Sequence, residues 1–113
     1  MHEISLCEGI LQVIESEAEK QDFKRVKTVC LEIGELSCVE NEALIFAFDS
    51  VIKNSIADGA KLEIVSLPGT AWCMKCGKNV RVKQRFDQCP ECDSYQLQAT
   101  GGDEMRIKEL EVE

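Results

Sequence analysis

The sequence has few of the features that mark membrane, secreted or nucleic-acid-binding proteins. Its longest unbroken apolar run is Ala43–Phe48, six residues, whereas a membrane-spanning helix needs about 20. The first ten residues have neither the basic start nor the apolar core of a signal peptide, so we expect a cytoplasmic protein. The net charge of −8 argues against a general nucleic-acid binder, because an acidic surface repels phosphate.

Histidine is scarce, because the chain has one, at position 2. No nucleophile–base pair and no open metal site stand out in the sequence, so we do not expect an enzyme. The hydrophobic fraction of 44% and the charged fraction of 30% are typical of a folded protein. A chain of 113 residues has room for one average domain or two small ones.

Cysteine, by contrast, is abundant. The chain has seven cysteines, an odd number, and an intracellular chain does not normally hold structural disulfides. Metal ligation or redox chemistry is therefore the better first interpretation. Two CxxC pairs contain four of them, and the other three are scattered at Cys7, Cys30 and Cys38. The paired residues are Cys73, Cys76, Cys89 and Cys92.

The charge is unevenly distributed along the chain. Residues 72–98 have a local net charge of +2, which leaves −10 for the remainder. Pro68-Gly69 precedes this basic stretch and Gly101-Gly102 follows it. The pattern predicts a small module at residues 69–102, inserted into an acidic domain made of residues 1–68 and 103–113.

The acidic part is predicted to be an α+β domain. One helix has a buried stripe that runs from Cys7 to Ala18, and a strand follows at Val26–Ile33. Ser37-Cys38-Val39-Glu40 has the form of a capping box, which predicts a second helix that runs to about Lys53. The stripes are Cys7, Ile10, Leu11, Ile14 and Ala18 in the first helix, and Leu44, Ala47, Phe48 and Val51 in the second. Strands are expected at Lys61–Leu67 and Met105–Val112, paired with each other across the insertion.

The two CxxC pairs are the strongest chemical signal. Four thiolates complete the tetrahedral shell of a zinc ion, so this zinc is expected to be structural. Gly77 suits the left-handed backbone that such a turn often needs, whereas Asp93 at the matching place tolerates it less easily. Val80 and Val82 alternate with charged residues, which predicts a short hairpin between the two pairs.

Three other interpretations of the four cysteines remain open. The first is two disulfides, or two buried pairs without metal. The second is a thioredoxin-like use of one CxxC, although neither pair opens a helix after a βαβ strand. The third is a zinc-ribbon adaptor that binds a protein or a nucleic acid, although the nearby aromatic residues form no stacking array.

The N-terminal Met1-His2-Glu3 forms a second candidate metal site. The α-amine of Met1, the backbone nitrogen of His2 and its imidazole can close fused five- and six-membered chelate rings on one cation. A planar set of nitrogen donors suits Ni(II) or Cu(II), and the Glu3 carboxylate lies within reach. A solvated terminus without function is the alternative.

Several motifs in this order resemble the HypA/HybF family, nickel-insertion accessory proteins of [NiFe] hydrogenase maturation. They are MHE at the start, LEIGELSCVE at Leu31–Glu40, the paired CxxC and CPxC, and GDEMRIKELEVE at Gly102–Glu113. The resemblance covers essentially the whole chain. It implies two helices packed on a small three-stranded mixed sheet, with a four-cysteine, zinc-ribbon-like domain inserted before the last strand.

The resemblance also implies functions for matching residues. Met1, His2 and Glu3 look like the family's nickel site, and Glu40 lies where the family has an acid near that end. The four paired cysteines look like its zinc ligands, while the other three match no ligand and are expected to be buried. The implied partners are a maturation GTPase and the hydrogenase large-subunit precursor, without nucleic acid or membrane, and with a homodimer left open. The implied function is a nickel metallochaperone with Ni(II) as transient cargo.

Overall fold

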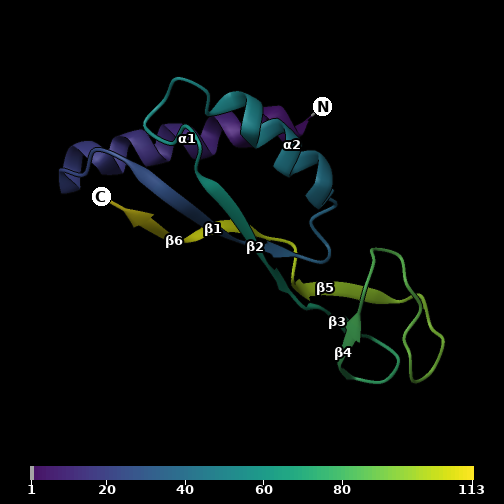
Figure 1. Ribbon diagram of the computed structural model, residues 1–113. Coiled ribbons are helices and arrows are strands. Elements are labelled where there is room, and N and C mark those ends of the chain that lie inside the picture. The colour runs from purple at the N-terminus through teal and green to yellow at the C-terminus, as the bar shows by residue number, and fades with distance from the viewer. Residues whose placement is uncertain (1) are drawn as a thin grey trace. The chain divides into compact units, whose positions relative to one another are not determined.

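The structure is a computed structural model that describes residues 2–113, with side chains from Glu3 onward (Figure 1). The elements in order are α1 (His2–Gln21), β1 (Val26–Gly34), α2 (Asn41–Val51), β2 (Lys61–Leu67), β3 (Gly69–Cys73), β4 (Lys78–Val82), β5 (Leu97–Gly101) and β6 (Met105–Val112). This order confirms the α+β fold class. None of the helices described in residues 2–113 could cross a membrane.

The chain divides into two compact units. The helical unit comprises Met1–Leu31, Val39–Ile64 and Ile107–Glu113. The cysteine unit comprises Glu32–Cys38 and Val65–Arg106.

The first sheet has the strand order β2-β1-β6. In Figure 1 the arrowheads of β1 and β2 point the same way and that of β6 points back, so the sheet is mixed. The prediction that the strands at Lys61–Leu67 and Met105–Val112 pair with each other is wrong, because β1 lies between them. The central place of β1 follows from its composition, since Val29, Cys30 and Leu31 are buried in succession and need cover on both faces.

Each of the two helices, α1 and α2, has one face that is buried. In α1 the predicted residues Cys7, Ile10 and Ile14 are buried, whereas Leu11 and Ala18 of the same stripe are half-buried. The Cys7 thiol lies 3.6 Å from the backbone oxygen of Leu44 in α2, which joins the two helices. In α2 the predicted residues Leu44, Ala47 and Phe48 are buried, whereas Val51 is only half-buried.

The start of α2 differs from the predicted capping box. The N-cap residue is Glu40, and no side chain caps the helix. Ser37 instead donates its hydroxyl to the Gly34 oxygen at 2.7 Å and therefore belongs to the turn that ends β1. Cys38 has a φ of 63°, which breaks the backbone geometry that a capping box requires. The helix also ends at Val51 rather than near Lys53.

The cysteine unit contains an antiparallel sheet of order β4-β3-β5. Ala71 at its centre pairs with Val80 on one side and Ala99 on the other. The hairpin predicted between the two CxxC pairs is wrong, because β4 pairs back onto β3 and the first CxxC begins at the end of β3 and runs into the turn. The buried core of the unit is small, and two of its six members are cysteines: Leu36, Ala71, Cys73, Val80, Val82 and Cys89.

Two glycines approach closely where β1 ends. The Gly34 amide donates to the Glu104 oxygen at 2.8 Å, and the Leu36 amide donates to the Gly102 oxygen at 2.7 Å. A Cβ on Gly34 would overlap the backbone carbonyl of Gly102. Because both clashing atoms belong to backbone, neither can move aside cheaply.

We expect the substitution Gly34→Ala to destabilise the protein by about 2 kcal/mol, the typical cost of forcing an extra carbon into a packed site. Gly9→Ala is the matched control, because Gly9 is an exposed residue inside α1 whose added Cβ would meet nothing within 4 Å. The control should stabilise by about 0.5–1 kcal/mol through helix propensity. Guanidinium unfolding of the zinc-loaded protein measures both, and equal effects would contradict the close approach.

Candidate metal centres

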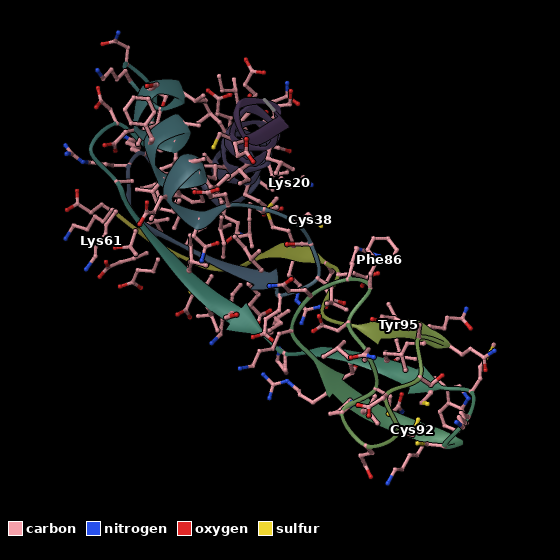
Figure 2. All side chains as sticks on the ribbon, turned by 90° about the vertical axis from the view of Figure 1, so that its right-hand side faces the viewer. Lys20, Cys38, Lys61, Phe86, Cys92 and Tyr95 are labelled. Atoms are coloured by element: carbon pink, nitrogen blue, oxygen red, sulfur yellow. The ribbon has the colours of Figure 1, made fainter. Side chains whose placement is uncertain are left out.

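Four cysteine side chains converge in the cysteine unit. Cys73 ends β3, and Cys76 lies in the turn that leads into β4. Cys89 and Cys92 belong to the segment between β4 and β5 (Cys92 is labelled in Figure 2). The four sulfur atoms all lie within 4.8 Å of one another.

The spacing of these sulfur atoms fits tetrahedral zinc. Cys73 Sγ lies 3.6 Å from Cys92 Sγ, and Cys76 Sγ lies 3.8 Å from Cys89 Sγ. Zinc–sulfur bonds of about 2.3 Å place neighbouring ligands of a tetrahedron about 3.8 Å apart. All seven cysteines are free, and these distances are far longer than the roughly 2.05 Å of a disulfide. The cluster therefore suits a closed, four-sulfur structural zinc site.

The two CxxC segments have the same backbone design. The Gly77 amide donates to the Cys73 oxygen at 2.8 Å, and the Asp93 amide donates to the Cys89 oxygen at 2.9 Å. Gly77 has a φ of 69° and Asp93 a φ of 60°, so both residues adopt the left-handed conformation. Asp93 takes it without the freedom of glycine, which costs about 1 kcal/mol. Because both pairs share this backbone geometry, the four thiols converge on one place.

The thiols differ in acidity. The pKa of Cys73 is lowered to about 7, first because the Cys76 amide donates to its sulfur at 3.3 Å. The pKa of Cys76 is raised to about 12, first by its hydrogen bond with Cys92. One thiol therefore ionises readily, while further negative charge in the cluster needs a cation beside it.

A salt bridge that was not predicted from the sequence joins the two CxxC segments. Lys78 follows the first pair and contacts Glu91, which lies between the two cysteines of the second. This contact is the first cause of the raised pKa of Lys78. Four thiolates around Zn²⁺ carry a surplus of two negative charges, so a cation close to Cys76 and Cys89 suits the site. The sequence indicated this pair only in that a base follows the first CxxC by two residues and an acid lies inside the second, and these places do not match between the two motifs.

The candidate nickel site lies at the start of α1. Met1 lies outside the described residues, and His2 is described only as the first residue of the helix. Glu3 is partly buried, and its charge is the second cause, after burial, that raises the pKa of Cys7 to about 11. The predicted joint action of these residues on a cation remains a prediction.

The three remaining cysteines are not equivalent. Cys7 and Cys30 are buried, which confirms the prediction that they pack as small apolar residues. Cys38 is exposed, so the prediction is wrong there. Its backbone is left-handed in the segment between β1 and α2, and its thiol lies 3.8 Å from the Leu36 oxygen.

Comparison with known proteins agrees with these features. A family model described as "Hydrogenase/urease nickel incorporation, metallochaperone, hypA" matches residues 1–112. The chain is 61% identical to "Hydrogenase maturation factor HypA" of Alkalilimnicola ehrlichii, and the match covers all of both chains. It is 60% identical to "Hydrogenase maturation factor HypA 2" of Bradyrhizobium diazoefficiens, again over all of both chains.

A solved structure shares the fold. The solution structure of the Ni metallochaperone HypA from Helicobacter pylori matches with a TM-score of 0.71 and 27% identity. The match covers 99% of this chain and 97% of the other. Family model, relatives and structure agree over nearly the full length, and the chain therefore belongs to the HypA family of nickel-incorporation metallochaperones.

Proposed function

We propose that this protein binds Ni(II) at its N-terminus and delivers it to a hydrogenase large-subunit precursor in the cytoplasm. It acts as a carrier rather than an enzyme, and its partners are that precursor and a maturation GTPase. The observation that carries the proposal is the family match over residues 1–112, with nickel incorporation as the family's described activity. Relatives at about 60% identity are named hydrogenase maturation factors, which favours hydrogenase as the recipient.

The nickel ligands in this proposal are Met1 and His2, with Glu3 beside them. Helix α1 begins at His2, and the first four N–H groups of a helix have no acceptor within that helix. The His2 amide therefore has no helical bond to lose when its nitrogen binds a metal. The positive end of the helix dipole opposes a bound cation, and the nearby Glu3 carboxylate offsets part of this effect. A site with so few protein ligands releases its metal readily, as delivery requires.

The zinc ligands in this proposal are the four clustered cysteines. Their shell is closed, so the zinc stabilises structure and leaves no position for a substrate. We assign residues 69–102 to a zinc-binding domain and residues 1–68 with 103–113 to the nickel-binding domain. The single histidine then belongs to the nickel domain and all zinc ligands to the other, so each domain binds its own metal.

Nickel titration tests this proposal directly. We expect tag-free, zinc-loaded protein to bind one Ni(II), and His2→Ala to bind at least about 100-fold more weakly because it loses a direct ligand. A variant with one extra residue before Met1 should lose affinity to a similar extent, because its α-amine is displaced. Isothermal titration calorimetry measures all three affinities.

Glu8→Gln serves as the control, because Glu8 is an exposed acid of α1 that is no part of the proposed site. Its affinity for nickel should equal that of the parent protein. Equal affinity in the parent and His2→Ala would exclude the N-terminal site and would leave the zinc-bearing adaptor as the better function.

A further inference from the structure

Helix α2 has a second organised face, which points to solvent. Glu42, Ile45, Phe46 and Asp49 follow the i, i+3, i+4, i+7 spacing and therefore form one stripe along the helix. All four side chains are exposed, Phe46 by 77% and Ile45 by 44%. We call these four residues the α2 stripe. Two large apolar side chains lie at its centre, with an acid one turn away on each side.

The acids of the α2 stripe are electrostatically unsatisfied. Neither Glu42 nor Asp49 forms a hydrogen bond or ion pair within the part of the chain that the structure describes. The last turn of α2 contains no basic residue. The helical unit as a whole has twice as many acidic as basic residues, so no positive field compensates this face.

We propose that the α2 stripe docks a basic amphipathic helix of a partner protein. The partner's apolar side chains would cover Phe46 and Ile45, and its lysines or arginines would lie one turn to either side, opposite Glu42 and Asp49. The two acids are seven residues apart, or about 10 Å along the axis, which matches two turns of a facing helix. This inference rests on the proposed function, because a nickel carrier must dock on the protein that loads or unloads it.

The negative charges of the α2 stripe favour one kind of binding partner over the others. A second copy of this chain, bound through the same face about a two-fold axis, would bring acids of one protomer against acids of the other. Nucleic acid and anionic lipid surfaces are repelled for the same reason. A basic amphipathic segment of a protein fits both the apolar and the acidic residues of the α2 stripe. Contact with the exposed aromatic side chain supplies affinity, and the opposite charges set the orientation and raise the rate of association.

The experiment uses two synthetic helical peptides and the full, zinc-loaded chain. One peptide is built of leucine, alanine and lysine with leucines at every third and fourth position, and in the other each lysine is replaced by glutamate. We expect the basic peptide to shift backbone amide resonances of residues 41–51 in nitrogen-15 spectra. The acidic peptide should bind at least about tenfold more weakly, and added salt should weaken only the basic one.

Substitutions assign the contact to individual residues. Phe46→Ser should weaken binding of the basic peptide about tenfold, and Glu42→Gln combined with Asp49→Asn several-fold, with a smaller salt dependence. Val13→Ser is the matched control, because Val13 is an exposed apolar residue of α1 (50%) and its loss should change nothing. Equal binding of both peptides, or resonance shifts centred outside residues 41–51, would overturn the proposal.

Nickel affinity separates this inference from the proposed function. Phe46→Ser should bind Ni(II) as tightly as the parent protein, because the substitution leaves Met1, His2 and Glu3 intact. Loss of peptide binding with unchanged nickel affinity supports the docking site. Nickel affinity that is equal in the parent protein and in His2→Ala would instead contradict the proposed function.

Discussion

Removal of zinc is expected to unfold the cysteine unit and to leave α1 and α2 helical. A structural zinc supplies about 10–16 kcal/mol of apparent folding free energy in small domains. Without the metal, the core of this unit would depend on Leu36, Ala71, Val80 and Val82, because its other two members are zinc-site cysteines. So small a core cannot offset the conformational entropy of the unit's chain.

Two-dimensional NMR during titration with a chelator measures this effect. The amide resonances of residues 65–106 should collapse to the range of unfolded chains, while those of residues 2–21 keep their dispersion. Cys73→Ser should behave like the chelated protein, and Cys38→Ser is its matched control because Cys38 is no part of the cluster. An apo protein with dispersed resonances throughout the cysteine unit would show that zinc does not hold this fold.

The second large effect is expected at the buried aromatic residue of α2. Phe48 is 1% exposed and Phe46 is 77% exposed, although the two lie two residues apart on the same helix. Phe48→Ala should destabilise the helical unit by about 3–5 kcal/mol, since it removes buried apolar surface and leaves a cavity. This loss is a large fraction of the roughly 5–15 kcal/mol that stabilises an ordinary domain.

Phe46→Ala is the matched control for this measurement. It makes the same chemical change on the solvent side of α2, so unfolding should change by no more than about 0.5 kcal/mol. Thermal unfolding followed by circular dichroism at 222 nm reports on both helices. Similar midpoints for the two variants would mean that α2 does not pack through Leu44, Ala47 and Phe48.

Local sequence patterns predicted most elements of this fold. The helical stripes of α1 and α2 are visible in the sequence because the burial of Ile10, Ile14, Leu44 and Phe48 follows a 3.6-residue period. Strand pairing was the less predictable part. Val80 and Val82 indicate a strand, but nothing local indicates that its partner is Gly69–Cys73, because pairing depends on the whole unit.

The capping-box prediction at Ser37 was wrong for a similar reason. A serine three residues before an acid satisfies the capping-box pattern, yet the Ser37 hydroxyl binds the Gly34 oxygen in the turn after β1. Side chains of this type bond to whichever backbone group is nearest, so a turn competes with a helix for the same residue.

The two metal centres were predictable to different degrees. Thiol ligands at CxxC spacing indicate a zinc site by themselves, and the four sulfurs of Cys73, Cys76, Cys89 and Cys92 converge as predicted. The N-terminal site depends on a backbone amine and amide, which every chain has. Only the histidine at position 2 and the resemblance to a family indicate a metal site at this N-terminus.

The exposed thiol of Cys38 has a practical consequence. Cys7 and Cys30 are buried, and zinc would occupy the four clustered cysteines. A maleimide reagent applied to the native, metal-loaded protein should therefore modify one position, without any engineered cysteine or removal of native ones. A fluorophore or nitroxide attached there sits in the segment between β1 and α2, four residues after Gly34 and two before Glu40. The wild-type chain thus provides its own attachment point for monitoring this segment when nickel or a partner binds.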